Sequence, residues 1–344
     1  MELANLSVLL VWGAATALAV ALIAFAVDLA RLSGAKIDAR DAARDAAKDR
    51  EKVAAGVGAP VDAPVSPYGP DDVMPHDAVP GDAGPGPVAG PVSRKLAGVG
   101  MSVTWLAAVL LLVAIVLRGI AAGRTPWANM YEFALVGTFV AVSVFVGVNT
   151  RRDVRFLGAF VSGIGVLFLV LAQEQFFVAA MGVQPALQRY WLVIHVGVAI
   201  CATGIFTVAF VTSVLQLLRD RRDNGSAVLG SGRWGWLDHT PAPAALESLS
   251  FRLNSVAFVL WTFTLIGGAI WAEDAWGRYW GWDPKEVWSF IVWVVYAAYL
   301  HARTTRGWSG TRAAWFVVAG YACVLFNFTG VNLIFNGLHS YSGL

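Results

Sequence analysis

Long apolar runs separated by short polar segments occupy most of the chain, and they predict a bundle of membrane-spanning helices. A helix needs about 20 predominantly apolar residues to cross the hydrocarbon core of a bilayer. Eight such runs each predict one span: residues 5–27, 98–117, 131–149, 156–172, 191–218, 253–271, 285–303 and 313–335. The predicted fold class is therefore an all-α, polytopic membrane protein.

The composition supports this interpretation and argues against soluble domains. Hydrophobic residues make up 57% of the 344 residues and charged residues only 14%, whereas soluble domains are about one quarter charged. A net charge of +2 gives no reason to expect a nucleic-acid partner. The expected surrounding is membrane lipid.

The positions of Lys and Arg predict the orientation of the spans. The connections after the first, third, fifth and seventh spans are rich in these residues, and the other connections hold few. Short cytoplasmic loops collect positive charge. The alternation therefore places both termini, and the connection between spans six and seven, on the external side.

Three segments follow from this pattern. Residues 1–27 predict a retained N-terminal transmembrane helix, because no basic residue precedes the apolar run and no cleavage site follows it. Residues 28–97 predict a cytoplasmic linker, charged at first and then rich in Pro and Gly, which is largely disordered because it cannot bury a core. Residues 98–344 form the main membrane domain.

The two cysteines, Cys201 and Cys323, lie within apolar runs. No CxxC pair, zinc pattern or CxxCH haem-attachment motif is present. Both thiols are expected to be buried and inert, and the chain is not expected to be a c-type cytochrome itself.

The external connection between spans six and seven carries five tryptophans between residues 271 and 288. Trp276 and Trp280 are four residues apart, so a helical turn here would place both indoles on one face. An interfacial aromatic belt is one explanation, and a platform for a flat ligand is the other. The density of tryptophans favours the platform. Its aromatic residues are Trp271, Trp276, Tyr279, Trp280, Trp282 and Trp288.

Two histidines are predicted to lie at the same external face. His195 is near the outer end of span five, and His339 follows span eight. A single membrane histidine is more often a packing residue. Two of them flanking an aromatic platform favour a pair of axial ligands to haem iron.

His301 is predicted to lie near the inner surface, because 17 residues of helix beyond Pro284 cover about 26 Å. It is too far from the platform to bind the same metal. An ionisable residue within a span is a functional hypothesis by default. Either His301 binds a second haem with a ligand from another polypeptide, or it is an interfacial residue beside Arg303.

Asp283, Pro284 and Glu286 predict the start of the seventh span, with Asp283 as N-cap, Pro284 at the first helical position and a capping box completed by Glu286. A structural role is therefore favoured for both acidic residues. The candidates to pair with haem propionates are Arg278, Lys285, Arg124 and Arg189.

The run from Trp276 to Trp288, followed by Trp293 and His301, closely resembles the tryptophan-rich "WWD" signature of haem-handling proteins. Within that group the chain is most similar to the CcsA (ResC) family of system II cytochrome c biogenesis. Further matches are Pro126 to Phe133 and the terminal Leu338-His339-Ser340-Tyr341. The resemblance covers residues 98–344, with the WWD segment at 271–288, and the linker is a departure from it.

This resemblance implies a holocytochrome c synthase in the plasma membrane that exports haem b, its substrate and bound cofactor, and attaches it to the CxxCH motif of an apocytochrome c. His195 and His339 match the external iron ligands, and His301 matches a membrane-embedded ligand. The implied partners are a CcsB (ResB)-type membrane subunit, which supplies the ligand opposite His301, and a thiol-reducing thioredoxin-like protein. Trp276, Trp280, Trp282 and Asp283 are expected beside the histidines in the reacting site, and Trp271, Tyr279, Trp288 and Arg278 among the haem contacts.

Three alternatives compete with this reading. One is a system I relative that loads haem onto a chaperone without forming thioethers. Another is a transporter of a different planar ligand, which predicts no haem spectrum. The third is a respiratory subunit that uses histidine pairs for electron transfer, which predicts no effect on cytochrome c maturation.

Overall fold

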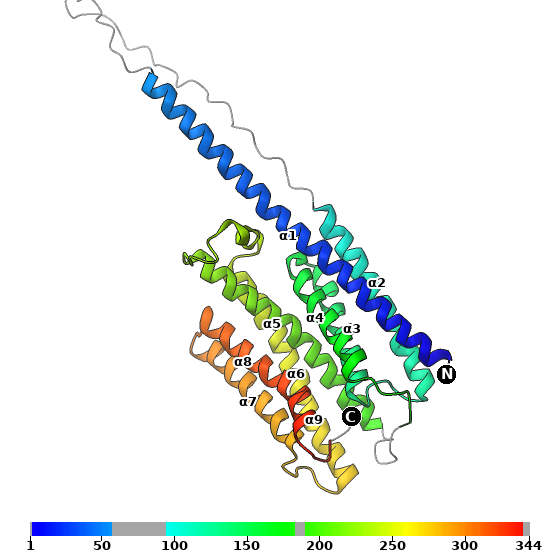
Figure 1. Ribbon diagram of the computed structural model, residues 1–344. Coiled ribbons are helices and arrows are strands. Elements are labelled where there is room, and N and C mark those ends of the chain that lie inside the picture. The colour runs from blue at the N-terminus through cyan, green and yellow to red at the C-terminus, as the bar shows by residue number, and fades with distance from the viewer. Residues whose placement is uncertain (1, 57–93, 183–189, 340–344) are drawn as a thin grey trace, which may run out of the picture.

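A computed structural model describes residues 2–56, 94–182 and 190–339, and these residues contain helices and no strand. The long helices pack side by side as an elongated bundle (Figure 1). The elements are α1 (Glu2–Gly56), α2 (Lys95–Ala122), α3 (Met130–Asn149), η1 (Arg155–Leu157), α4 (Gly158–Gln175), η3 (Leu192–Val196), α5 (Gly197–Asp223), η4 (Gly232–His239), α6 (Pro243–Trp276), α7 (Pro284–Thr305), α8 (Thr311–Phe328) and α9 (Gly330–Ile334).

The all-α, multi-spanning fold is confirmed. Within the described residues, seven helical segments are long and apolar enough to cross a membrane. The eighth expected span, 285–303, forms α7 but is not among them. Tyr296, Tyr299 and His301 interrupt its apolar run, and both tyrosines are buried against neighbouring helices.

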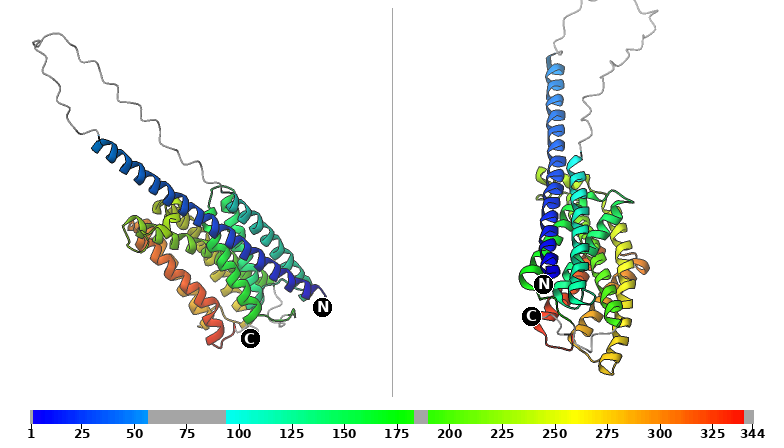
Figure 2. Two further views of the ribbon diagram at one scale, coloured as in Figure 1. Left: turned by 45° about the horizontal axis from the view of Figure 1, so that its top comes forward. Right: turned by 90° about the vertical axis from the view of Figure 1, so that its right-hand side faces the viewer.

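The bundle has two packed halves that share α5. One core is formed mainly by the five helices α1, α2, α3, α4 and α5, with Phe25, Leu111 and Phe145 among its fully buried side chains. The other joins α5, α6, α7 and α8, where the rings of Phe206 and Tyr296 stack at 3.9 Å. In the views of Figures 1 and 2, α7 and α8 lie together on one flank and α1 and α2 on another.

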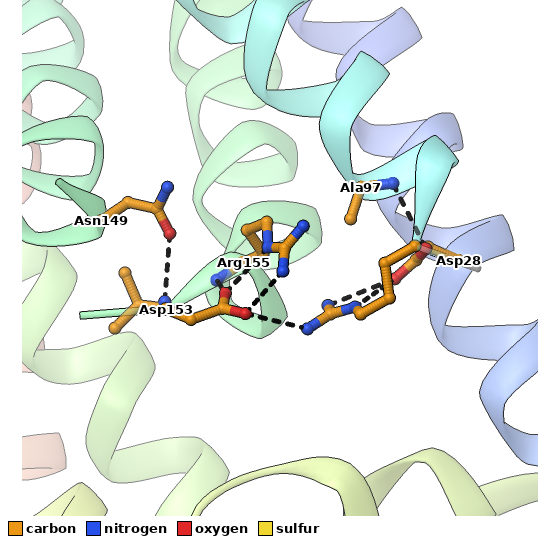
Figure 3. Close-up of polar contacts among 7 residues, drawn as sticks. Asp28, Ala97, Asn149, Asp153 and Arg155 are labelled. Carbon is orange, nitrogen blue, oxygen red and sulfur yellow. Dashed lines mark hydrogen bonds and ion pairs between the residues drawn. The ribbon is translucent and has the colours of Figure 1, made fainter. Parts of the chain in front are cut away.

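The basic connections gather at one end of the bundle, opposite the end where α1 starts and α9 lies (Figure 1). Arg94 bridges Asp28 at 3.2 Å and Asp153 at 3.3 Å, so it joins α1 to the connection between α3 and η1. Figure 3 shows Asp153 paired with Arg155, at 2.6 Å, and Asp28 accepting the Ala97 N–H. The hydrogen bond from Arg155, only partly opposed by burial, lowers the pKa of Asp153 to about 2.

Helix α1 continues without a break from the first predicted span to Gly56. Asp28, placed at the start of the linker by its charge, is buried and belongs to the packed part of α1. The Pro- and Gly-rich part of the predicted linker, 57–93, lies outside the described residues.

The expectation of buried cysteines is wrong for Cys201, which is exposed on α5, while Cys323 is half-buried. An apolar run in a spanning helix has a side that faces lipid as well as a side that faces protein. Hydrophobicity along the sequence therefore does not distinguish the two sides.

Candidate functional site

A cavity lies at the end of the bundle that holds α9 and the segment after it, with Asn332 and His339 among its lining residues. It is lined by α3, α5, α6, α7 and α8 together with the segments that follow α6 and α9, so it lies where the two packed halves meet. Both histidines predicted to share an external face line this cavity, although they are far apart in sequence. The lining residues used below are His195, His339, Trp127, Phe133, Trp261, Gly268, Trp271, Tyr279, Trp280, Lys285, Glu286, Ser289, Asn327 and Phe328.

His195 reaches the cavity from η3, a five-residue π-helix at the start of α5. A π-helical turn is rare in proteins overall, but those that occur are frequently at functional sites. The ring Nδ1 lies 2.9 Å from the Thr264 carbonyl oxygen on α6. The ring also lies against Trp271, with 5.6 Å between centroids.

Gly268 makes room for the His195 ring. A Cβ atom at this position would lie 2.7 Å from Cε1 and 3.1 Å from Nδ1 of His195. The absence of a side chain on this face of α6 therefore allows the imidazole to pack against the helix backbone. The sequence analysis did not use the Gly267-Gly268 pair, although a glycine within an apolar helix permits such a close approach.

His339 is held by Asp283, whose Oδ2 lies 2.8 Å from its Nδ1. The same carboxylate accepts the N–H of Leu338 at 2.7 Å and that of Lys285 at 3.1 Å. Burial raises the pKa of Asp283, but the hydrogen bond from His339 and the backbone donors outweigh it, and the net pKa is lowered.

The predicted capping box at the start of α7 is confirmed. Asp283 caps the helix, and Glu286 accepts the Asp283 N–H at 3.1 Å and that of Gly281 at 2.8 Å. The local sequence pattern favoured this structural role for Asp283, and the family resemblance placed it beside the histidines of the reacting site. Neither showed that one carboxylate joins the cap to His339, because the two residues are 56 positions apart.

The helical turn that would align Trp276 and Trp280 does not form. Helix α6 ends at Trp276, and Gly277 follows in a left-handed conformation with a φ of 67°. The two indoles instead have separate neighbours: Trp276 lies 5.1 Å from the His339 ring, and Trp280 lies 5.9 Å from Trp282.

The remaining aromatic residues of the segment fall into three environments. Trp271 is buried in the cavity wall, and Tyr279 lines the cavity beside Trp280. Trp282 is 77% exposed and has a φ of 59°, which bulky residues rarely adopt. Trp288 packs on Phe326, at 4.3 Å, and does not line the cavity.

Four basic residues were predicted to pair with haem propionates, and two of them have acidic side chains nearby. Arg278 lies 3.6 Å from Glu286, and Arg124 lies 2.7 Å from Glu132. Glu132 is fully buried and also pairs with Arg118 at 3.0 Å, an arginine that the sequence reasoning did not single out. Arg189 lies outside the described residues, and Lys285 lines the cavity.

His301 lies on α7 away from the cavity and is exposed. It shares a face of the helix with Phe290 and Val294, which are 48% and 44% exposed. His301 therefore lies apart from the cavity that His195 and His339 line, and its place near the inner membrane surface stays a prediction.

Several cavity residues were not selected as ligands from the sequence, including Trp127, Phe133, Trp261 and Phe328. The indole N–H groups of Trp127 and Trp271 are buried without a hydrogen-bond partner, as is the side-chain oxygen of Asn327. Buried polar groups are normally satisfied, so these three groups are available to pair with a ligand in the cavity.

Comparison with known proteins gives an independent result. The family described as "Cytochrome C assembly protein" matches residues 127–339. The "Cytochrome c biogenesis protein CcsA" of Guillardia theta is 32% identical over 271 residues, which cover 74% of this chain and 90% of that protein. The protein of the same name from Synechococcus sp. (strain CC9902) is 36% identical over 255 residues, covering 69% and 84%.

A solved structure named "Cytochrome c Heme Lyase CcmF" has a similar fold, with a TM-score of 0.53 and 17% sequence identity. The match covers 69% of this chain and 41% of that one. The family resemblance inferred from the tryptophan-rich segment is confirmed, and the matched region contains both cavity histidines and the whole of the segment. The chain belongs to the cytochrome c assembly protein family, among relatives named CcsA.

Proposed function

We propose that this chain presents haem at the outer cavity for covalent attachment to an apocytochrome c. The observation that carries the proposal is the pair of imidazoles, His195 and His339, which line one aromatic cavity and are each fixed through Nδ1 by an acceptor on another element. A neutral imidazole that donates from Nδ1 has its lone pair on Nε2, the atom that binds iron. A hydrogen-bond acceptor at the other ring nitrogen orients a histidine that binds a metal.

The cavity walls suit a flat, largely apolar substrate such as haem b. Trp127, Trp261 and Trp271 provide ring surfaces, and Phe133 and Phe328 close the apolar wall, with their rings stacked at 4.9 Å. Trp276, Trp280, Trp282 and Asp283 then have different roles in the proposal. Trp276 packs on His339, Trp280 lines the cavity, Trp282 is exposed beside Trp280, and Asp283 holds His339 in place.

The attachment step is the addition of each cysteine thiol of the CxxCH motif across a haem vinyl group. One C–S bond forms, the vinyl C=C becomes a single bond, and the thiol hydrogen goes to the other vinyl carbon, so the addition needs no net oxidant or reductant. The protein contributes positioning, since holding both reactants converts a bimolecular step into an effectively unimolecular one. A thioredoxin-like reductant would keep the two thiols reduced beforehand.

His301 has a separate place in this proposal. It is exposed on α7 and far along the helix from Pro284, so it would hold haem before the outer cavity does. The opposing ligand would come from a ResB-type membrane subunit packed on the face that carries Phe290 and Val294. The orientation of the chain in the plasma membrane, with the cavity external, belongs to the same proposal and rests on the Lys and Arg pattern.

Co-expression of the full chain with a ResB-type subunit and a CxxCH reporter tests the function. We expect covalent haem on the reporter, and loss of most of it in His195→Ala and His339→Ala, with partial recovery on adding imidazole. His239→Ala is the matched control, because this histidine is exposed on η4 at the opposite end of the bundle.

The outcomes separate the competing functions. No covalent haem above a control without the chain would reject the synthase proposal. A purified chain with no haem spectrum would favour a transporter of another ligand. A bound haem that cycles reversibly, with normal cytochrome c maturation in the deletion strain, would favour electron transfer.

A further inference from the structure

The cavity that holds His195 and His339 also contains a basic side chain, Lys285, which has no part in the proposed binding of iron. Lys285 lines the cavity from the first turn of α7, and its Nζ donates to the backbone oxygen of Asn327 at 2.6 Å. Within the part of the chain that the structure describes, no carboxylate lies within ion-pair distance of this ammonium group. Lys285 therefore lines the cavity with no acidic side chain in direct contact with its Nζ among the described residues.

The nearby acidic groups are committed elsewhere. Asp283 binds His339, Leu338 and the backbone of Lys285. Glu286 binds two backbone N–H groups of its own cap and faces Arg278 at 3.6 Å. Neither carboxylate neutralises the Lys285 ammonium by direct contact.

The surroundings of Lys285 also offer neutral polar groups. Asn327 is 5% exposed, and its side-chain oxygen has no partner. Its NH2 group donates to the Ser289 hydroxyl across 3.4 Å, which is long for a hydrogen bond. The amide is therefore weakly held and can present either its oxygen or its NH2 group to a ligand. The rest of the cavity wall is mainly aromatic.

A charged amine in a largely apolar cavity is unfavourable, and an oppositely charged group on a ligand offsets that cost. We propose that Lys285 is the binding site for a carboxylate of an otherwise apolar, planar ligand. If the ligand is haem, as the proposed function holds, Lys285 is the group that pairs with a haem propionate. Arg278 and Arg124 are less suited to this role, because neither lines the cavity. Arg124 also pairs with Glu132 at 2.7 Å.

This assignment fixes the direction in which haem lies. The propionates of haem b occupy one edge of the ring, and the vinyl groups lie toward the other. A propionate at the corner formed by α7 and α8 directs the vinyl edge away from that corner. Lys285 is thus a specificity-determining residue that selects which edge of the ring is available to the cysteine thiols.

The test uses the purified full chain in detergent and two probes, haem b and its dimethyl ester, in which both carboxylates are neutral. Dissociation constants are measured from the absorbance of the bis-histidine complex. We expect the wild-type chain to bind the acid about 10- to 100-fold more tightly than the ester, as charge-assisted hydrogen bonds suggest. Lys285→Met is expected to abolish this preference while keeping the bis-histidine spectrum, and Lys285→Arg to retain most of it.

Lys95→Met is the matched control, because this lysine is exposed at the start of α2 and is expected to leave the preference unchanged. Equal binding of acid and ester by the wild-type chain would overturn the inference even if Lys285→Met failed to fold. The same preference in Lys285→Met as in the wild type would also overturn it. Both results leave the proposed function intact, whereas absence of a bis-histidine complex with either probe in the wild type would reject the function as well.

Discussion

Asp283 contacts His339 across 56 positions of sequence, with 2.8 Å between Oδ2 and Nδ1, while it also caps α7. The start of a helix and a proposed iron ligand therefore depend on one carboxylate. Leu338 strengthens the connection, because its N–H donates to the other oxygen at 2.7 Å. The cap thus positions the segment after α9 as well as the helix that it begins.

Replacing Asp283 with Asn is expected to separate these two roles. Asn is as good an N-cap as Asp, so α7 should still form, but the charged acceptor for His339 is lost. We expect haem affinity at this cavity to fall about 10- to 100-fold, as when the hydrogen-bond partner of a metal-binding histidine is changed in other proteins. The measurement is haem titration of the purified chain, with circular dichroism as the check on folding. Unchanged affinity would contradict a positioning role for Asp283.

Gly268→Ala is expected to displace His195. The new Cβ would lie 2.7 Å from Cε1 of the imidazole, and a rotamer change to relieve this costs about 1 kcal/mol or more. We expect weaker haem binding by about tenfold, visible as loss of the bis-histidine spectrum. Gly267→Ala is the matched control, because its Cβ would meet only ordinary contacts, the nearest at 3.7 Å. Equal effects of the two variants would rule out the steric explanation.

The variants Trp282→Ala and Trp282→Gly are expected to differ in thermal stability because of the backbone conformation at this position. Both substitutions remove the exposed indole, so both should lower covalent attachment if it contacts haem or the apocytochrome. At a φ of 59°, Gly avoids the steric cost of a left-handed residue, about 1 kcal/mol. Trp282→Gly should therefore melt at a higher temperature than Trp282→Ala in detergent. A higher melting temperature for the Ala variant would show that the left-handed conformation is not maintained.

The ion-pair cluster at the opposite end of the bundle gives a prediction for pH. The folded pKa of Asp153, about 2, lies below the ordinary value of 3.8. A lowered pKa means that the carboxylate stabilises the fold above about pH 4, and that this contribution is lost as the pH falls toward 2. Because Asp153 is half exposed, the expected effect is less than about 1 kcal/mol.

Melting temperatures of the wild type and Asp153→Asn test this. The wild type should be the more stable at pH 6, and the difference should shrink between pH 4 and pH 2. A difference that stays constant over this range would show that the negative charge of Asp153 is not responsible for it.

The sequence by itself determined the helices and the residue types of the site. Apolar runs and Lys and Arg placement depend only on local composition, and a capping box spans four residues, so each is visible along the chain. The family could also be recognised, because the tryptophan-rich run is continuous. The same local reasoning overestimated regularity at Trp276, since Gly277 ends α6 where an uninterrupted turn was considered.

Only the tertiary structure decided which groups meet. Asp283 and His339, Gly268 and His195, and Lys285 and Asn327 belong to different elements. The packing of the two halves around α5 brings them to one cavity, and no periodicity within a single helix encodes that packing. It also decided which side of each apolar helix is buried, as the exposed Cys201 shows. The physical reason is that a spanning helix is apolar on all sides, so its hydrophobicity places it in the membrane without selecting a partner. The contacts that build a site depend on how neighbouring helices fit together.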